Sequence, residues 1–352
     1  MSDPSSPPPA AQVMQLLSGC FFAQAVYVTA KLGLADRLAA GPATAAALAQ
    51  AVGADEAALA RMLRLLVMLG VFQQDPAGRF TNTPLSNALR GDAPDSLRDL
   101  AIWWCEEPHW RVYGQLLESV RTGECGWPLV HGTGIFPYLA DTNPALGEVF
   151  NRAMTSFSST TIPAVLEAYD FSTFGVVADV GGGRGHLLAA ILQANREARG
   201  ILLDSDAALT EAAALLEQAG VAGRARILAA DFFAPPKFTA DAIVLKHIIH
   251  DWPDDASICI LRALRGALAT HGRLLILDMV VPEGDSFHLS KICDMEMLVS
   301  AGGRERTAAE FRSLLDAAGF RMTRIVPTSS VVSVIEAVPA VHRDTAQADV
   351  GQ

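Results

Sequence analysis

A glycine-rich run, DVGGGRG at Asp179 to Gly185, constrains this 352-residue chain more than any other feature. It directly follows the apolar stretch 176–180 and precedes a segment with a helical pattern, which is the setting in which such a run binds a ligand. A dinucleotide fingerprint needs glycine at positions one, three and six, but the sixth residue counted from Gly181 is His186. Glycine at Gly181 and Gly183 lets the backbone turn tightly and approach a ligand, and Asp179 suits a cationic amino group better than a pyrophosphate. A tight turn without a ligand is the alternative.

From about residue 166 to 338 the pattern alternates between short apolar strands and helices. This alternation predicts an α/β domain with a parallel, doubly wound Rossmann-like sheet, whose ligands bind at the carboxyl ends of the strands. The expected strands are 176–180, 200–203, 225–229, 240–245, 273–279, 322–327 and 331–337, and the expected helices are 185–194, 207–219, 254–269 and 307–318.

The next two strands also end in polar or aromatic groups. Asp204 closes the second strand, where a carboxylate can accept both ribose hydroxyls of a nucleoside. After the third strand, Asp231 can accept from an adenine amino group while Phe232 covers the ring. Helix caps or a core position are the alternatives for each residue alone. Three such strand ends in succession indicate a nucleoside site.

The fourth strand leads into LKHIIHDWPDD, residues 245–255. If the chain is helical here, Lys246 and His250 lie on one side, four residues apart. His247 and His250 are a possible metal pair, but no third ligand stands out, so no metal is expected. His250 follows a strand end and is a candidate general base.

Two further acids are candidates for the same site. Asp278 ends the fifth strand, and Glu305 lies in a loop before a helix. Helix N-terminal charge is the alternative role for Glu305.

Residues 13–100 are predicted to form a winged-helix-like dimerisation domain, since helical patterns precede a hairpin at 71–81. DNA binding is disfavoured because the helices that would read DNA carry only Arg61 and Arg64 as cations, beside Asp55 and Glu56. The first helix, 13–32, is apolar on several faces, which favours burial against a second subunit in a homodimer.

Residues 101–165 are expected to be a helical linker that contributes to a substrate pocket. Its aromatic and methionine side chains fit a protein core or an apolar ligand site. The candidate substrate-binding residues are Trp104, Met154, Phe157, Asp294 and Met297.

Composition narrows the partners. The net charge of −11, without a basic block, argues against nucleic acid, and the target is more plausibly a small molecule. No uninterrupted apolar run is long enough for a membrane span. Five scattered cysteines suit free thiols in a reducing compartment, so a cytoplasmic protein is expected. Residues 1–12 and 339–352 are expected to be a disordered and a flexible tail.

With these motifs in view, the chain resembles the metal-independent small-molecule O-methyltransferases, which include the caffeate and flavonoid enzymes of plants and bacterial natural-product enzymes. The resemblance covers residues 13–338 and rests on LGLADRL (32–38), DVGGGRG, LLDSD, DFF, KHIIHDWPDD, LLILDMVVPEG and GGRERTAAEF. It implies a winged-helix dimerisation region joined to a Rossmann-like class I methyltransferase domain, with a partner subunit contributing to the pocket.

The resemblance also implies roles for single residues. S-adenosylmethionine would be held by Gly181, Gly183, Asp204, Asp231, Phe232 and Lys246. His250 would take the proton of a phenolic hydroxyl, with Asp278 and Glu305 flanking its imidazole. Two departures from the plant pattern are Asp204-Ser205-Asp206 in place of Asp-Leu-Pro, and Asp278 in place of glutamate.

The sequence therefore predicts an S-adenosylmethionine-dependent O-methyltransferase that acts on an aromatic hydroxyl without a metal. Two alternatives stay open. Enzymes of the same fold use this cofactor in hydroxylation, decarboxylation or pericyclic chemistry, but they tend to have lost the base or its partners. A ligand-sensing DNA-binding regulator is the other alternative.

Overall fold

The computed structural model describes residues 7–340, which divide into two compact units. One unit contains residues 7–114 and 136–159, and the other contains residues 115–135 and 160–340. The predicted linker 101–165 is thus shared between the two units. Each unit has a hydrophobic core of its own.

The N-terminal part of the first unit is helical, as predicted. Its helices are α1 (Pro9–Leu17), α2 (Gly19–Leu32), α3 (Leu34–Leu38), α4 (Ala45–Val52) and α5 (Glu56–Met68). The prediction of a disordered tail over 1–12 is wrong from Pro9 onward, where α1 begins. Proline suits this first helical position, because its fixed φ is helical and its missing N–H would have no partner there. Residues 1–6 lie outside the described residues.

The predicted hairpin is confirmed as β2 (Phe72–Gln74) and β3 (Arg79–Asn82), which pair antiparallel. Asp75 closes its turn by accepting the N–H groups of Ala77 and Arg79 at 2.9 Å each. A short strand that the sequence did not indicate, β1 (Ala43–Thr44), joins β3 on its other side. The sheet covers a core of leucines from α3, α4 and α5.

The segments between this core and the α/β domain form further helices. They are α6 (Pro84–Asn87), α7 (Arg98–Cys105), α8 (Glu107–Tyr113), α9 (Leu116–Thr122), α10 (Gly126–His131), α11 (Ile135–Pro137), a π-turn at Tyr138–Thr142, and α12 (Pro144–Ala168). Pro128 stands in the first turn of α10, where a helix tolerates it. Trp127 of this helix is fully buried.

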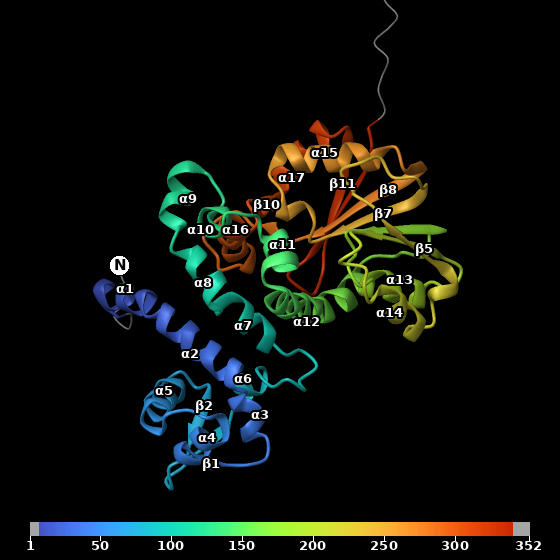
Figure 1. Cartoon of the computed structure of the whole chain (residues 1–352). Coiled ribbons are helices and arrows are strands. Elements are labelled where there is room, and N and C mark those ends of the chain that lie inside the picture. Colours follow the sequence, from blue (N-terminus) through green and yellow to red (C-terminus); the bar gives the residue numbers. More distant parts are fainter. Residues whose placement is uncertain (1–6, 341–352) are drawn as a thin grey trace, which may run out of the picture. The chain divides into compact units, whose positions relative to one another are not determined.

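The second unit contains a seven-stranded sheet with the order β11-β12-β8-β7-β4-β5-β6 (Figure 1). The strands are β4 (Val176–Val180), β5 (Arg199–Asp204), β6 (Ala225–Ala229), β7 (Ala240–Lys246), β8 (Leu268–Asp278), β11 (Phe320–Pro327) and β12 (Ser333–Pro339). The five strands from β8 to β6 are parallel, as expected.

The prediction of a wholly parallel sheet is wrong for β12, which runs antiparallel to both β8 and β11. The physical reason is the short connection at 328–332, because a parallel return needs a crossover of a dozen or more residues. β12 continues to Pro339, so the prediction of a flexible tail from residue 339 is wrong at Pro339. The rest of that tail, 341–352, lies outside the described residues.

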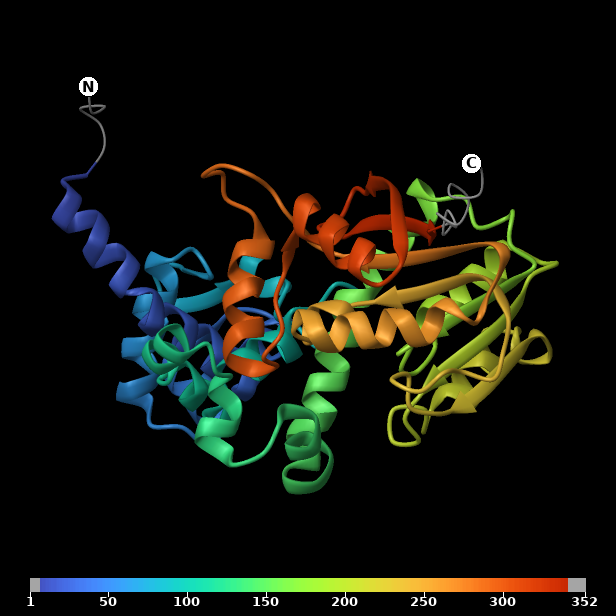
Figure 2. The same cartoon turned by 90° about the horizontal axis from the view of Figure 1, so that it is seen from above.

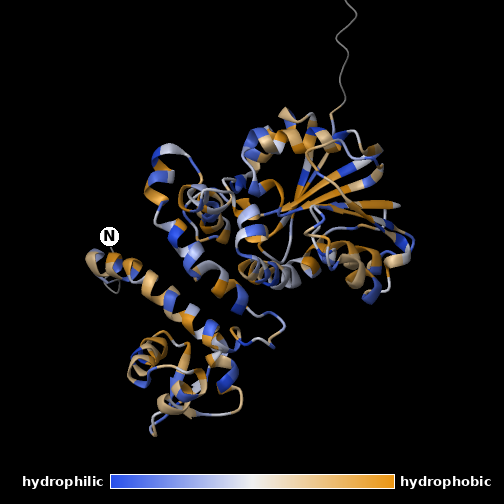
Figure 3. Ribbon diagram, in the orientation of Figure 1, coloured by the Kyte–Doolittle hydropathy of each residue, from blue (hydrophilic) through white to orange (hydrophobic). Residues whose placement is uncertain are grey.

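Helices cover both faces of this sheet. α13 (His186–Ala194) and α14 (Ala212–Gln218) pack on one face, and α15 (Asp254–Arg265) and α17 (Ala308–Ala317) on the other (Figures 1 and 2). Because side chains alternate along a strand, Val177 belongs to the first core and Ala178 to the second. The central strands are correspondingly apolar (Figure 3). This doubly covered sheet brings the carboxyl ends of β4, β5, β6, β7 and β8 to one edge.

Candidate active site

The glycine-rich run forms a tight loop after β4. Gly181, Gly183 and Gly185 have φ of +70°, +55° and +86°, a region that side chains other than glycine rarely adopt. A Cβ at Gly181 would lie 2.3 Å from Ile248, and one at Gly182 would lie 2.6 Å from the carboxyl carbon of Asp179. The loop therefore has no room for a side chain at Gly181 or Gly182, where it presents bare backbone at the edge of the sheet.

Asp179 is buried beneath this loop, only 1% exposed. Neither of its carboxyl oxygens has a hydrogen-bond partner of normal geometry among residues 7–340. Burial raises the pKa of Asp179 to about 7, and the positive charge of Lys246 opposes that rise. An unsatisfied buried carboxyl of this kind is a natural acceptor for a cationic or hydrogen-bonding ligand group.

Lys246 is the last residue of β7 and is half-buried. Burial lowers the pKa of Lys246, while the carboxylates of Asp179 and Asp278 act in the opposite direction. The predicted helical spacing between Lys246 and His250 is wrong, because the strand continues to Lys246 and the chain then turns sharply. His247 occupies that turn with a φ of +54°, a strained conformation for a residue with a side chain.

The neighbouring strand ends carry the predicted nucleoside residues. Both oxygens of Asp204 accept backbone N–H groups, from Gly183 at 2.8 Å and Ser205 at 2.7 Å. Each oxygen keeps a further lone pair for a ligand hydroxyl. Burial raises the pKa of Asp204, and these two hydrogen bonds oppose that rise. The carboxylate is therefore fixed beside the glycine-rich loop.

The group after β6 is more exposed. Asp231 accepts the N–H of Phe233 at 2.9 Å, which closes a turn. Phe232 lies 5.4 Å from the ring of Phe233 and 6.3 Å from that of Trp252, centroid to centroid. These three rings form an aromatic cluster at the same edge.

His250 lies in a 3₁₀ turn, Ile249–Asp251, that follows β7. Its Nδ1 donates to Oε1 of Glu305 at 2.8 Å, and its Nε2 lies 3.4 Å from Oδ1 of Asp251. Burial alone would lower the pKa of His250, but the carboxylates of Asp251 and Glu305 outweigh it and raise that pKa to about 10. The imidazole is thus oriented by Glu305 and strongly basic.

Asp251 was not singled out by the sequence analysis, although it directly follows His250. Its neighbourhood becomes visible only when the turn is folded, since adjacent residues usually point apart. Burial raises the pKa of Asp251 to about 6, and the positive charge of His250 opposes that rise.

Asp278 is fully buried at the end of β8, and neither of its oxygens has a hydrogen-bond partner of normal geometry in the described part of the chain. Its Oδ1 lies 3.5 Å from Nδ1 of His247. Burial raises the pKa of Asp278 to about 6, with the charge of His250 opposing. Asp278 therefore acts on His250 through its charge, without a hydrogen bond, whereas Glu305 contacts it.

His247, His250 and Asp278 place possible metal-ligand atoms within 4.8 Å of one another. The sequence pattern indicates no third ligand for the two histidines, but in the folded chain Asp278 lies beside them. Lys246 interacts with the same carboxylate, and its positive charge disfavours a further cation there. The absence of a metal stays a prediction.

The predicted substrate-binding residues fall in both units. Asp294 and Met297 lie on α16 (Leu289–Ser300) of the second unit, while Trp104, Met154 and Phe157 belong to the first unit, and all five are half-buried. Asp294 has a contact that the sequence did not reveal: its Oδ1 accepts the backbone N–H of Glu305 at 2.9 Å. A shared pocket formed by the five residues stays a prediction.

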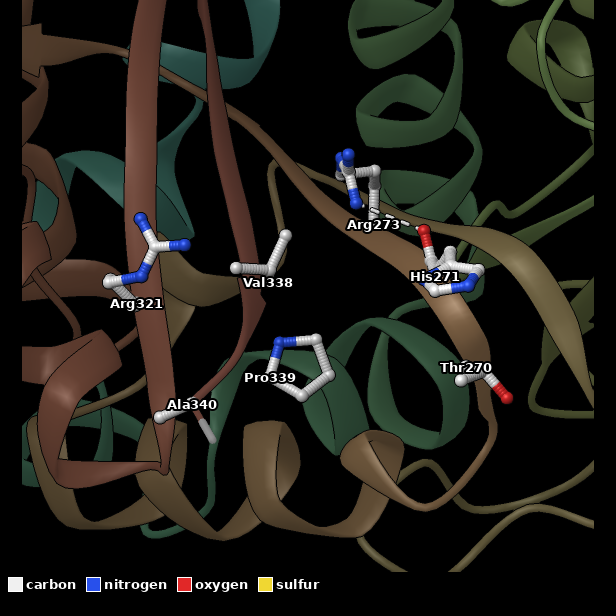
Figure 4. A pocket seen from close by; sticks show the side chains of 8 residues that line it. Thr270, His271, Arg273, Arg321, Val338, Pro339 and Ala340 are labelled. Atoms are coloured by element: carbon white, nitrogen blue, oxygen red, sulfur yellow. Dashed lines mark hydrogen bonds between the residues drawn. The ribbon is translucent and has the colours of Figure 1, made fainter. Parts of the chain in front are cut away.

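A cavity of about 600 Å³ lies elsewhere, at the opposite edge of the sheet, where β8 begins and β12 ends (Figure 4). Its lining contains none of the residues above; it consists of Thr270, His271, Gly272, Arg273, Arg321, Val338, Pro339 and Ala340. Ligands of doubly wound sheets bind at the carboxyl ends of parallel strands, so we place the functional site at the other edge.

Comparison with known proteins identifies the family of this chain. Residues 113–321 match an O-methyltransferase domain, and residues 14–92 match an O-methyltransferase dimerisation domain. A phenazine O-methyltransferase from Lysobacter antibioticus is 42% identical over 93% of this chain and 95% of its own length. An 8-amino-8-demethylriboflavin N,N-dimethyltransferase from Streptomyces davaonensis is 36% identical over 88% of this chain and 90% of its own.

A solved structure of the calicheamicin-biosynthesis methyltransferase CalO1, in its S-adenosylhomocysteine-bound form, has a TM-score of 0.82. It is 36% identical and covers 94% of this chain and 98% of its own. The fold and the matched domains thus define an S-adenosylmethionine-dependent methyltransferase of class I. More narrowly, the chain belongs to the O-methyltransferase family whose members carry an N-terminal dimerisation domain.

Gly182→Ala is expected to weaken cofactor binding at least about tenfold, or about 1.4 kcal/mol, because the new Cβ would displace Asp179 and the loop. Gly223→Ala is the matched control, since a Cβ there meets nothing within 4 Å. Titration calorimetry with S-adenosylhomocysteine measures both variants. An unchanged dissociation constant for Gly182→Ala would contradict the assignment of this loop to the cofactor.

Proposed function

We propose that this protein transfers the methyl group of S-adenosylmethionine to a hydroxyl of an aromatic small molecule, with His250 as general base. The observation that carries the proposal is the 2.8 Å hydrogen bond between His250 and Glu305, at the same sheet edge as the glycine-rich loop. A phenol with a pKa of about 10 is mostly neutral at pH 7, so a base must accept its proton as the methyl is transferred.

The residues around the loop fit the cofactor. Its sulfonium supplies an activated methyl group. We propose that Asp179 binds its cationic amino group, that Gly181 and Gly183 let it approach the backbone, and that Asp204 binds the ribose hydroxyls. Asp231 and Phe232 would hold the adenine, and Lys246 would tune the charge of Asp179, with which it interacts.

The chain's own acid–base chemistry then follows. Glu305 holds Nδ1 of His250 in its protonated form, which leaves Nε2 as the atom that takes the proton of the acceptor. The carboxylates of Asp251 and Glu305, with Asp278 nearby, stabilise the imidazolium that forms. The remaining acceleration would come from the alignment of the acceptor oxygen with the methyl group.

The acceptor is proposed to be an aromatic hydroxyl held by Trp104, Met154, Phe157, Asp294 and Met297. An amine acceptor is the second candidate, since one relative is named an N,N-dimethyltransferase. Two observations favour a hydroxyl: His250 is strongly basic, and Glu305 orients it. The same two residues argue against the non-methylating chemistry known in this fold.

Replacement of His250 by alanine is expected to lower kcat roughly 10²- to 10⁴-fold, the usual contribution of a general base. Binding of S-adenosylhomocysteine should change little, because His250 is not among the proposed cofactor ligands. Release of S-adenosylhomocysteine with a panel of phenolic acceptors measures turnover, and calorimetry measures binding. Full turnover in this variant would refute the role of His250.

The Glu305→Gln variant is expected to shift the pH profile to lower pH. Loss of this carboxylate lowers the pKa of His250, so the neutral imidazole forms at lower pH and the rising limb of kcat/KM moves down. The maximal kcat should fall, because the base is weaker and less well oriented. Glu310→Gln, which removes a carboxylate that contacts Arg304 and Thr307, should keep the native profile. An unshifted limb in Glu305→Gln would count against the assignment.

We further propose that a second copy of this chain covers α1 and α2. Together these helices span Pro9–Leu32, a 24-residue stretch that is interrupted by polar residues but is, on average, long and apolar enough to cross a membrane by composition alone. Its exposed apolar residues include Leu16 (81%), Leu17 (63%) and Phe21 (68%). Most of this stretch belongs to the matched dimerisation domain, which favours a homodimer over a membrane as the occupant. We also propose that the winged-helix-like domain serves only in dimerisation and that the protein is cytoplasmic. It would bind neither nucleic acid nor membranes.

A Leu17→Asp/Phe21→Asp variant is expected to be monomeric, because two charges would be desolvated in the interface. Val120→Asp is the control, as Val120 is similarly exposed (66%) but lies on α9, outside the matched dimerisation domain. Light scattering after size exclusion gives the mass of each. A monomeric native protein that floats with phosphatidylglycerol vesicles would overturn the dimer in favour of a membrane.

A further inference from the structure

We propose that Arg306 is a positioning residue that holds the His250–Glu305 pair in its reactive geometry. The proposal rests on the proposed role of His250 as base. Arg306 follows Glu305 directly and begins β10 (Arg306–Thr307), which pairs in parallel with β9 (Val280–Val281). It is 1% exposed, which is unusual for an arginine and requires that its charge and N–H groups be satisfied internally.

The guanidinium of Arg306 binds the backbone on both sides of His250. Its Nη1 donates to the carbonyl of Ile249 at 3.0 Å, and its Nη2 donates to the carbonyl of Trp252 at 2.9 Å. Ile249 precedes His250 and Trp252 lies two residues after it. One rigid planar group therefore fixes both ends of the turn that carries the imidazole.

The backbone before Arg306 lies directly on the same turn. The N–H of Arg304 donates to the carbonyl of His250 at 2.8 Å. A Cβ at Gly303 would lie 1.9 Å from that carbonyl oxygen, closer than any real contact. Segment 303–306 and turn 249–252 are thus in backbone contact, and the guanidinium of Arg306 fastens one to the other.

The charge of Arg306 is balanced from the solvent side. Asp254 binds its Nε at 3.0 Å and its Nη2 at 2.8 Å, while the Asp254 side chain is 54% exposed. The positive charge of Arg306 is therefore neutralised by Asp254 where its guanidinium contacts the turn. A lysine could not make the same set of contacts, because its three donors leave from one atom, whereas guanidinium donors form a planar fork.

This arrangement ties the catalytic pair together. Glu305 adjoins Arg306 in the chain, and His250 lies within the turn that Arg306 binds, so the same side chain sets both partners of the 2.8 Å hydrogen bond. Asp294 holds Glu305 from the other side by accepting its backbone N–H. A displacement of about 1 Å at a reacting group can cost about 10² in rate.

The decisive variant is Arg306→Lys. We expect kcat to fall roughly 10- to 100-fold while KM for S-adenosylmethionine stays within about twofold. The downfield proton resonance of the His250 Nδ1–H···Glu305 bond should weaken or move in the NMR spectrum of the full-length protein. Arg262→Lys is the matched control: it is the same change at an exposed arginine of α15, whose guanidinium donates to the carbonyl of Ala317.

Asp254→Asn is the second variant, in case Arg306→Lys does not fold. Asp254 is half-exposed, so its replacement leaves the core intact while loosening the guanidinium; a smaller loss of kcat with the same resonance shift is expected. The resonance is assigned by its loss in His250→Ala, whose turnover tests the base separately. Native kcat together with an unchanged resonance in Arg306→Lys, or in Asp254→Asn if the former does not fold, would overturn the proposal.

Discussion

The hydrogen bond between His250 and Glu305 joins two segments 55 residues apart, and much of the second unit is arranged so that it can form. His250 follows β7. Glu305 precedes β10, which pairs with β9, and β9 directly follows the end of β8. An imidazole and a carboxylate buried together are stable only if their remaining polar atoms and the backbone around them are satisfied. Arg306, Asp294 and the N–H of Arg304 meet that requirement for the backbone around the pair, whereas Oε2 of Glu305 has no hydrogen-bond partner among residues 7–340.

A second constraint is the concentration of buried charge at the carboxyl edge of the sheet. Asp179, Lys246, Asp251 and Asp278 all have pKa values shifted by burial toward their neutral forms. Such an edge is costly to fold without a ligand, since each charge must be desolvated or neutralised. Groups of this kind gather where ligands bind. They therefore favour a functional site at the carboxyl edge of the sheet over one at the cavity on the opposite edge.

Features of this fold that depend on interactions between residues near in sequence can be predicted from the sequence. Features that depend on contacts between distant segments cannot. Strands β4 and β6 appear at the expected residues because a short apolar run between turns is a local signal. The direction of β12 depends on its connection and its neighbours, and the role of Asp251 on a turn that forms only in the folded chain. Arg306 reads as an ordinary charged residue in GGRERT, because the carbonyls it binds come from a segment some fifty residues earlier. For Lys246 and His250, the sequence analysis considered a local helical spacing, but Lys246 ends a strand and His250 lies in the turn that follows it.

The basicity of His250 has a consequence for the order of events in catalysis. With a pKa of about 10, the imidazole of the free protein is protonated at neutral pH, and this pairing contributes stability that is present below the unfolded value of about 6.5 and lost as pH rises through 10. A cationic cofactor at the same edge repels the imidazolium and so lowers its pKa. Linkage makes this reciprocal: the cofactor binds more tightly as His250 loses its proton. In the proposed mechanism, the carboxylates of Asp251 and Glu305 would keep His250 a strong base, and the positive charge of the bound cofactor would bring it to the neutral form that accepts a proton.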